Sequence, residues 1–288
     1  MTSSRWQGVA WITLSAAGFG AMAIFVKLAY RDGISLTTLL FLRFAIAGAL
    51  LAAWGAWQGM RWPRGRDLAG LVAMGGVGYV GQSFSYFAAL QYASAGLVAI
   101  LLYLYPAIVV VLSALVFGRK IGVRRAWAVA VALVGTALTV GGDLHSLWQG
   151  VALGIAAALI YSIYILAGES LMPRVGALPA STVVMLSAAV VYGLLTFGGG
   201  LRLPETSGGW AAILAIALFS TLIAILCFFK GLEKLGAADA STLSTLEPLV
   251  TLALAAAVLD ESVTAIQLSG GALILAAVIG LARLPAMR

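Results

Sequence analysis

The pentapeptide Trp-Gln-Gly-Val-Ala stands at Trp6–Ala10 and again at Trp148–Ala152, 142 residues further along the chain. The same offset carries Pro106 onto Pro248, and both prolines lie inside otherwise continuous hydrophobic runs. No gap is needed to keep the two halves of the 288-residue chain aligned. Repetition at a fixed offset is typical of an internal duplication. The predicted units are residues 1–143 and residues 144–288.

The composition predicts an integral membrane protein. Hydrophobic residues make up 62% of the chain, charged residues make up 9%, and the mean hydropathy is +1.07. So few polar residues cannot cover a water-soluble fold. Apolar runs long enough to cross a hydrocarbon core of about 30 Å, which takes roughly 20 helical residues, recur along the whole chain. We predict an all-α protein with ten transmembrane helices at residues 8–28, 36–57, 68–88, 93–117, 126–140, 148–168, 180–200, 210–229, 237–259 and 265–283.

The basic residues predict the orientation of these helices. Most of the 17 lysines and arginines fall on the side that holds Arg5, whereas Lys27, Arg31 and Arg202 fall on the other side. Because basic loops stay in the cytoplasm, both termini are predicted to be cytoplasmic.

Five helices per unit is an odd number, so the second unit enters the membrane from the opposite face. The two repeats are therefore predicted to be inverted. Inverted repeats allow two related conformations that open a central site to one face at a time, which is the geometry of alternating access. Channels and membrane enzymes also contain duplications, and that alternative stays open.

Two of the seven prolines, Pro106 and Pro248, lie within predicted helices, about twelve residues from the start of each. A proline removes a backbone donor and kinks its helix. Broken helices at mid-membrane depth usually line a cavity. We predict that both prolines act as hinges or as cavity walls, and a packing kink without function is the alternative.

Several short motifs, taken in order, resemble one transporter family. They are Leu-Arg-Phe at Leu42–Phe44, Gly-Arg-Lys at Gly118–Lys120, Leu-Glu-Pro at Leu246–Pro248, and the pair Asp260 and Glu261. With ten helices in two halves, the whole chain resembles the EamA branch of the drug/metabolite transporter superfamily, and within it most closely the YddG-type exporters of amino acids. The resemblance implies transport of metabolites, often export, through a cavity between the halves.

The third predicted helix carries a polar stripe of Tyr79, Gln82, Ser83 and Tyr86. Their spacing of i, i+3, i+4 and i+7 puts them on one helical face, and such a face turns inward in lipid. Tyrosine and glutamine offer both donors and acceptors, which suits a zwitterion with an apolar side chain. We predict a wall that faces the substrate, and hydrogen bonding between helices is the alternative.

Glu247 is the one carboxylate that lies deep within a predicted span, about 15 Å from its start at roughly 1.5 Å per residue. An acidic residue inside the membrane is a site hypothesis by default. We predict that it binds a substrate amine or exchanges protons, and a neutral side chain that braces the kink is the alternative. Ser244 and Thr245 precede it as further candidates, and the 142-residue offset pairs it with Tyr105.

Other aromatic and basic residues receive lesser roles. Tyr103, Tyr161 and Tyr164 are predicted to line or narrow the cavity. Arg43 is predicted to be structural, either snorkelling toward the outer face or pairing with another helix.

No catalytic, metal or cofactor site is predicted. The run from Gly76 to Gly81 matches the dinucleotide-binding pattern GxGxxG, but no strand precedes it and no helix begins there, so helix packing explains it better. The chain has one histidine, His145, and neither an HExxH nor a CxxC motif.

Together these features predict a multi-pass exporter of a bacterial-type inner membrane. Its cargo is predicted to be small metabolites, in particular amino acids with aromatic or other neutral side chains. A single deep acid favours facilitated diffusion over an ion-coupled relay. The alternative is proton-coupled efflux of lipophilic cations through Glu247, and an enzyme or sensor without transport is a remote one. The expected partners are the small-molecule substrate and the lipid bilayer, without nucleic acid or an obligate protein partner.

Overall fold

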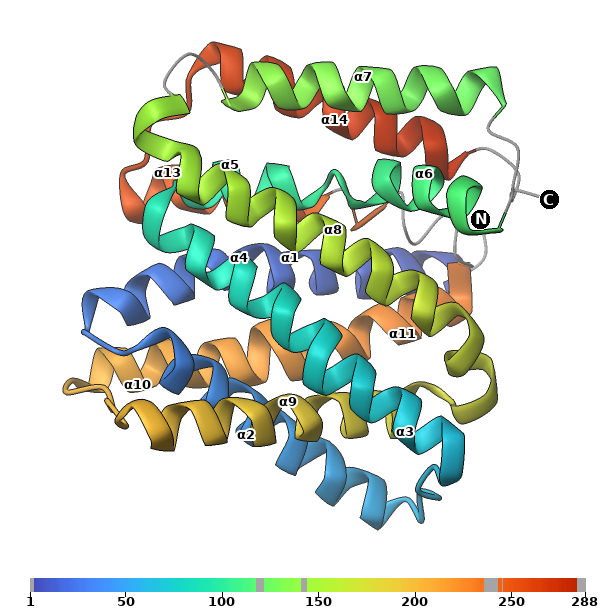
Figure 1. The fold of residues 1–288 in the computed structure, drawn as a ribbon, viewed down its shortest axis with the longest axis vertical. Helices are drawn as coiled ribbons and strands as arrows, with labels where there is room; N and C mark the ends of the chain where they lie inside the picture. Colours follow the sequence, from blue (N-terminus) through green and yellow to red (C-terminus); the bar gives the residue numbers. More distant parts are fainter. Residues whose placement is uncertain (1–2, 118–121, 141–143, 236–242, 245, 284–288) are drawn as a thin grey trace.

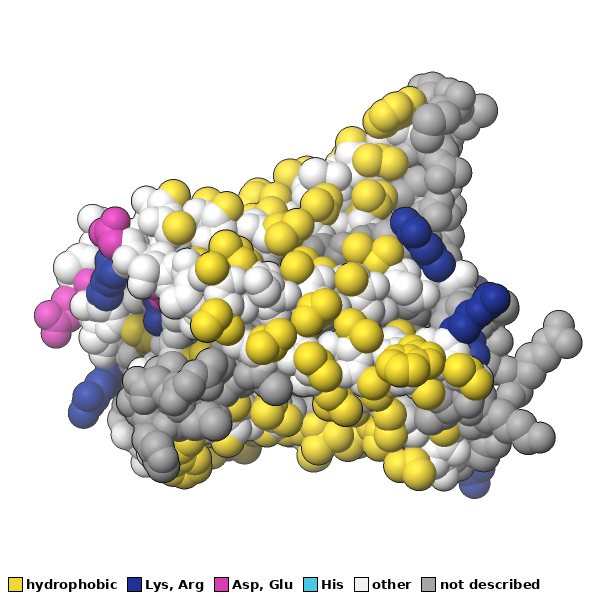
Figure 2. Space-filling view, turned by 90° about the horizontal axis from the view of Figure 1, so that it is seen from above, with side chains coloured by type: hydrophobic (Ala, Val, Ile, Leu, Met, Phe, Trp, Pro, Cys, Tyr) yellow, Lys and Arg dark blue, Asp and Glu magenta, His cyan; other side chains and the backbone are white. Residues whose placement is uncertain are grey.

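The computed structural model describes residues 3–117, 122–140, 144–235, 243–244 and 246–283, and every regular element in these ranges is a helix. The helices run side by side across the molecule (Figure 1). On the face shown in Figure 2, basic and acidic side chains gather at the two ends of the helices, and hydrophobic side chains fill the band between them. An apolar band between two charged ends is the pattern of a protein that spans a bilayer.

The first half of the chain contains five helical rods. The third contains a π-helical segment, and the fourth is broken into two helices. The elements are α1 (Ser3–Arg31), α2 (Leu36–Trp57), the continuous rod of α3 (Gly65–Ala73), η1 (Met74–Tyr79) and α4 (Val80–Tyr92), the pair α5 (Ala95–Leu102) and α6 (Tyr105–Phe117), and α7 (Val123–Val140).

The second half repeats this order. Its elements are α8 (Leu144–Val175), α9 (Ala177–Gly199), the continuous rod of α10 (Ser207–Leu214), η2 (Ala215–Ile223) and α11 (Ala224–Leu235), then α13 (Leu246–Leu259) and α14 (Ala265–Ala282).

Six helical stretches of the described residues are long and apolar enough to cross a membrane. They are Trp6–Arg31, Leu36–Trp57, Ala95–Leu112, Trp148–Gly168, Ala177–Gly199 and Ser207–Phe228, and Leu246–Leu259 and Ala265–Ala277 form shorter apolar helices. The predicted span 36–57 has the bounds of α2, because Ser35 caps that helix: its hydroxyl accepts the Thr38 amide at 3.3 Å.

The main helix pairings between the two halves correspond to one another under the 142-residue offset. Helix α1 packs on α11 and α13, and α8 packs correspondingly on α4 and on α5 and α6. Helix α2 packs on α9, and α7 packs on α14, which are pairings of an element with its own equivalent. The 142-residue offset therefore describes the repeat of helix contacts as well as the repeat of sequence.

The two continuous rods each contain a π-helical segment, η1 and η2. The offset carries residues 74–79 onto residues 216–221, which lie inside η2. Segments of this kind are rare and frequently occur at functional sites. At η1 the rod also comes close to α9: a Cβ on Gly75 would lie 2.5 Å from the Val184 carbonyl oxygen. The run from Gly76 to Gly81 lies within this helical rod. This position agrees with the prediction that these glycines serve helix packing and not nucleotide binding.

The helix predicted over residues 93–117 is broken and not merely kinked. The amides of Tyr103 and Leu104 bond to the carbonyls three residues earlier, at 3.0 and 3.1 Å, so α5 ends in a tight turn. Pro106 follows in the first turn of α6, where its missing donor costs least. In the second half Pro248 occupies the first turn of α13, and residues 236–242 and 245 lie outside the described residues.

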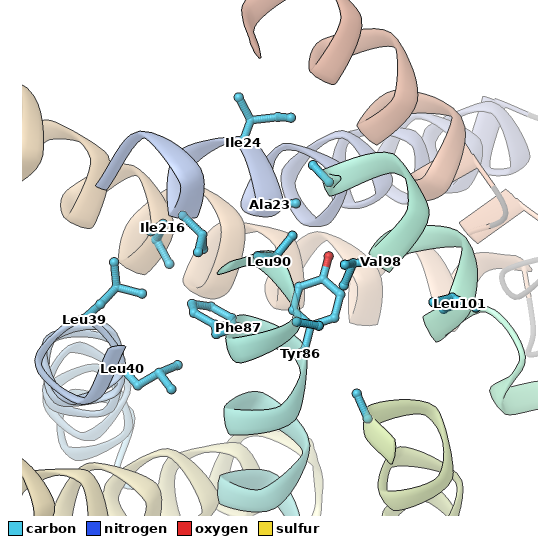
Figure 3. Close-up of a cluster of buried hydrophobic side chains, with 14 of the residues drawn as sticks. Ala23, Ile24, Leu39, Leu40, Tyr86, Phe87, Leu90, Val98, Leu101 and Ile216 are labelled. Atoms are coloured by element: carbon cyan, nitrogen blue, oxygen red, sulfur yellow. The ribbon is translucent and has the colours of Figure 1, made fainter. Parts of the chain in front are cut away.

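The largest buried cluster joins the two halves. Figure 3 shows side chains of α1, α2, α4 and α5 meeting Ile216 of η2. In lipid, no expulsion of water drives apolar side chains together, so close dispersion contacts hold such helices in place. This cluster lies beside the cavity described next, since Tyr86 and Phe87 belong to both.

Candidate functional site

A cavity of about 350 Å³ lies between helices of the two halves. Pockets that hold small molecules typically measure roughly 300–1,000 Å³. Nine of the predicted site residues line it, and Pro248 does so as well. The nine are Tyr79, Gln82, Tyr86, Tyr103, Tyr105, Tyr161, Tyr164, Ser244 and Glu247.

Five of these residues form a continuous band of rings, which we call the tyrosine band. It comprises Tyr79, Tyr164, Tyr161, Tyr105 and Tyr103. The ring centroids are 5.6 Å apart for Tyr79 and Tyr164, 6.1 Å for Tyr164 and Tyr161, 5.0 Å for Tyr161 and Tyr105, and 5.9 Å for Tyr105 and Tyr103. These distances are those of stacked and edge-to-face aromatic pairs. The band joins residues of both halves into one wall with aromatic faces and phenolic hydroxyl groups.

Glu247 lies in the first turn of α13, at one end of the tyrosine band. Pro248 has no amide hydrogen to give to the Ser244 carbonyl, and the Tyr103 hydroxyl donates to that oxygen instead, at 2.6 Å. The Glu247 carboxyl lies within electrostatic reach of Tyr86, Tyr103 and Tyr105. Among the described residues no lysine or arginine forms an ion pair with it. Within the described part of the chain, the cavity thus holds a carboxyl group without a basic partner.

Close contact with α1 fixes the backbone around Glu247. The Thr251 hydroxyl donates to the Gly20 carbonyl at 2.8 Å. A Cβ on Gly20 would lie 2.7 Å from the Glu247 carbonyl oxygen, so only glycine allows this approach. Helix α13 is therefore held against α1 at the depth of the acidic side chain.

Arg43 lies on the cavity wall, and its predicted outward snorkelling is wrong. Its side chain is buried, with a relative exposure of 3%, because η1, η2 and α4 surround it. Its Nε donates to the Thr221 hydroxyl at 3.0 Å and its Nη2 donates to the Tyr79 hydroxyl at 3.4 Å. These bonds confirm the alternative prediction, that Arg43 pairs with another helix. An arginine eight residues into an apolar helix must face inward, and that signal was available in the sequence.

Two aromatic rings hold the guanidinium of Arg43 in place. Its central carbon lies 4.9 Å from the ring centroid of Phe44 and 5.1 Å from that of Phe87. The two hydroxyl groups that it binds, on Tyr79 and Thr221, are equivalent under the 142-residue offset and belong to the two π-helical segments. Arg43 therefore connects the halves at their matched irregular turns.

The remaining predicted residues lie elsewhere or are not described. Ser83 does not line the cavity: its hydroxyl donates to the Tyr79 carbonyl at 2.6 Å and lies 3.0 Å from the Tyr192 hydroxyl. This arrangement fits the alternative of hydrogen bonding between helices. Thr245 lies outside the described residues, as does the side chain of Pro106. No cluster of three or more potential metal ligands occurs in the described part of the chain.

Glu261 joins the ends of three helices, α1, α5 and α13. These ends lie at the left of Figure 1, away from the start of α1. Both carboxylate oxygens of Glu261 accept the Ala95 amide at the start of α5, at 3.1 and 2.9 Å. The same carboxylate pairs with Lys27 of α1 at 3.1 Å. We call this contact the Glu261 tie, and it joins α1, α5 and the end of α13.

Membrane-length helices around a cavity lined by aromatic rings, phenolic hydroxyls and one carboxyl group are typical of a multi-pass membrane protein that binds a small solute. The EamA-like transporter family matches residues 6–141 and again residues 148–283, and the two matches begin 142 residues apart. The chain belongs to this transporter family.

Individual relatives agree with this assignment. The chain is 28% identical to an uncharacterized transporter of Archaeoglobus fulgidus over 276 residues, which is 94% of this chain and 95% of the relative. It is 23% identical to the uncharacterized transporter YcbK of Bacillus subtilis over 278 residues, 91% of this chain and 88% of the relative. One crystal structure, at 20% identity, covers 95% of each chain with a TM-score of 0.68 and shares the fold.

Proposed function

We propose that this transporter exports small neutral amino acids, including aromatic ones, across a bacterial-type inner membrane, as YddG-type exporters do. The observation that supports the proposal is the single cavity in which the tyrosine band and Glu247 meet. Aromatic faces accept an apolar side chain, phenolic hydroxyls and Gln82 offer donors and acceptors, and the carboxylate accepts an ammonium group. A zwitterion with an aromatic side chain needs all three.

Transport in this proposal proceeds by alternating access between two inverted halves, with both termini in the cytoplasm. The paired helix contacts, the matched π-helical segments and the presence of both halves in the cavity wall support it. In the proposed cycle, α1 with α11 and α13 opens one end of the cavity, and α8 with α4 and α6 opens the other. Pro106 and Pro248 begin the helices at which such motion is concentrated.

Facilitated diffusion is the proposed energetic mode. Of the described residues that line the cavity, Glu247 is the one acidic side chain. Sodium sites require several oxygen ligands, and proton relays use chains of titratable groups. A single acidic side chain can bind a substrate amine, but it forms neither a sodium site nor a proton relay.

Efflux of lipophilic cations is the second candidate, because tyrosine faces and Glu247 both attract positive charge. The buried guanidinium of Arg43 lies on the same cavity wall and repels a cation. A solute with both charges is therefore favoured over a purely cationic one.

The test is phenylalanine flux in proteoliposomes, with and without an imposed proton gradient. Tyr79→Ala and Tyr86→Ala are expected to slow flux while the protein remains folded, and Glu247→Gln is expected to weaken substrate binding. Glu205→Gln, which removes an exposed carboxylate, is the matched control. Flux that is indifferent to the gradient supports facilitated diffusion. Flux that follows the gradient and is lost in Glu247→Gln would replace that mode by proton coupling, and absence of amino-acid flux would reject the cargo.

A further inference from the structure

We propose that Arg43 binds the carboxylate of the transported solute, so that a carboxylate is a requirement for recognition. The proposal deepens the proposed function and rests on it for the identity of the transported solute. It adds a basic group to the site, opposite in sign to an ionised Glu247. It also gives a binding function to Arg43, for which the sequence predicted only a structural role.

No carboxylate in the described part of the chain neutralises the charge of Arg43. No carboxylate of the described residues lies within ion-pair distance of it, and its hydrogen-bond acceptors are the neutral hydroxyls of Tyr79 and Thr221. A buried charge without a counter-charge is costly. An anion that binds beside Arg43 removes that cost, so the part of the cavity around Arg43 favours an anionic group.

The guanidinium also has donors to spare. It carries five N–H groups, and its bonds to Thr221 and Tyr79, the ones seen among the described residues, use two of them. The Thr221 hydroxyl donates in turn to the Ile216 carbonyl at 2.8 Å, which leaves its oxygen to accept from Arg43. With Nε bonded to Thr221 and the central carbon near the rings of Phe44 and Phe87, the remaining N–H groups form a preorganised fork. A fork of this shape fits the two oxygens of a carboxylate.

Arg43 and Glu247 place a basic and an acidic group in the same cavity. Tyr86 lies within electrostatic reach of both Arg43 and Glu247, and all three side chains line the cavity. An amino acid could then place its carboxylate at Arg43 and its side chain along the tyrosine band, with Glu247 in the same cavity attracting its ammonium group. Lipophilic amines lack the contact with Arg43, and simple carboxylates lack the attraction to Glu247.

Equilibrium binding to the purified protein separates these contacts. The probes are phenylalanine, 3-phenylpropionate, which has no amine, and phenethylamine, which has no carboxylate. The variants are Arg43→Gln, Arg43→Lys and Thr221→Val, with Arg202→Gln as a control for loss of an exposed arginine. Loss of a hydrogen-bonded charge pair is expected to weaken 3-phenylpropionate binding about tenfold to a hundredfold in Arg43→Gln. Binding of phenethylamine should not weaken, and Arg43→Lys, which keeps the charge without the fork, should fall between wild type and Arg43→Gln.

Three results would overturn the proposal: unchanged 3-phenylpropionate binding in Arg43→Gln, equal weakening of both probes, or a wild-type protein that binds phenethylamine as well as phenylalanine. If Arg43→Gln does not fold, Arg43→Lys and Thr221→Val decide, and wild-type affinity for the carboxylate in both would reject the assignment. A wild-type protein that binds 3-phenylpropionate through Arg43 but moves no amino acid would refute the proposed cargo and leave the carboxylate site intact.

Discussion

Weakening the Glu261 tie is expected to open the cavity at the end where α1, α5 and α13 meet. The tie consists of two contacts of one carboxylate, to the Ala95 amide and to Lys27. Glu261→Gln keeps the size and shape of the side chain but removes its charge. In the proposed orientation this end faces the outside of the cell, so the substitution should favour the outward-open conformation.

The structure allows the size of the effect to be worked out. A hydrogen bond to a charged acceptor contributes about 1.5–3 kcal/mol and a neutral one about 0.5–1.5 kcal/mol, so loss of charge at the Ala95 amide costs about 1 kcal/mol or somewhat more. The Lys27 and Glu261 side chains are 23% and 16% exposed, so their ion pair adds at most about 1 kcal/mol. A total of about 1–2 kcal/mol changes the ratio of closed to open molecules roughly five- to thirty-fold.

Thiol accessibility measures this ratio. The chain has one cysteine, Cys227, and in a Cys227→Ser background Ala99→Cys places a reporter on the cavity wall in α5. A membrane-impermeant thiol reagent, added outside intact cells, should react roughly five to thirty times faster when Glu261→Gln is present. Glu205→Gln, at the same end of the molecule, should leave the rate unchanged. Equal rates in Glu261→Gln and its parent would refute the claim that this tie holds the cavity closed.

Two further predictions concern stability in detergent, measured by thermal unfolding. Tyr103→Phe leaves the Ser244 carbonyl without a donor and should destabilise the protein by about 1–3 kcal/mol, and an unchanged unfolding midpoint would show that another group satisfies that oxygen. Gly75→Ala forces a methyl group against the Val184 backbone and should cost about 1–3 kcal/mol. Gly76→Ala, whose methyl would meet Val191 at 3.6 Å, is the matched control and should be neutral or slightly stabilising; equal loss in both variants would contradict the packing argument.

Apolar runs and capping residues made most helix positions predictable. The span 36–57 coincides with α2 because apolar residues fill it and Ser35 caps its start. The break between α5 and α6 was predicted only as a kink at Pro106, since a proline shows that a hydrogen bond is lost but not how the preceding turn closes. The π-helical segments were not predicted. A π-helical segment holds more residues per turn than an α-helix. Because the segment is short, a search for a period of 3.6 residues does not detect it.

The cavity wall was predicted in large part because polar residues inside a membrane are rare. Tyr79, Gln82 and Tyr86 share a helical face, and Glu247 stands alone at depth, so their inward orientation follows from the cost of exposing them to lipid. Ser83 shares the face but turns to Tyr192, which a single-helix projection cannot reveal. Of the two predictions for Arg43, outward snorkelling was wrong and pairing with another helix is confirmed, because hydroxyl groups from two other rods bind its side chain. Those groups, Tyr79 and Thr221, were already paired by the repeat offset, and their pairing was the available signal.

The charges of the proposed site break the symmetry that the duplication supplies. The offset pairs Arg43 with Met185 and Glu247 with Tyr105, and all four side chains line the same cavity. Each unit therefore contributes one charge of one sign, and neither charge has a charged equivalent in the other unit. A zwitterion bound between Arg43 and Glu247 would bridge the first half of the chain and the second. Its binding free energy would then depend on how the halves are arranged, which is the condition for a solute to favour one conformation over another.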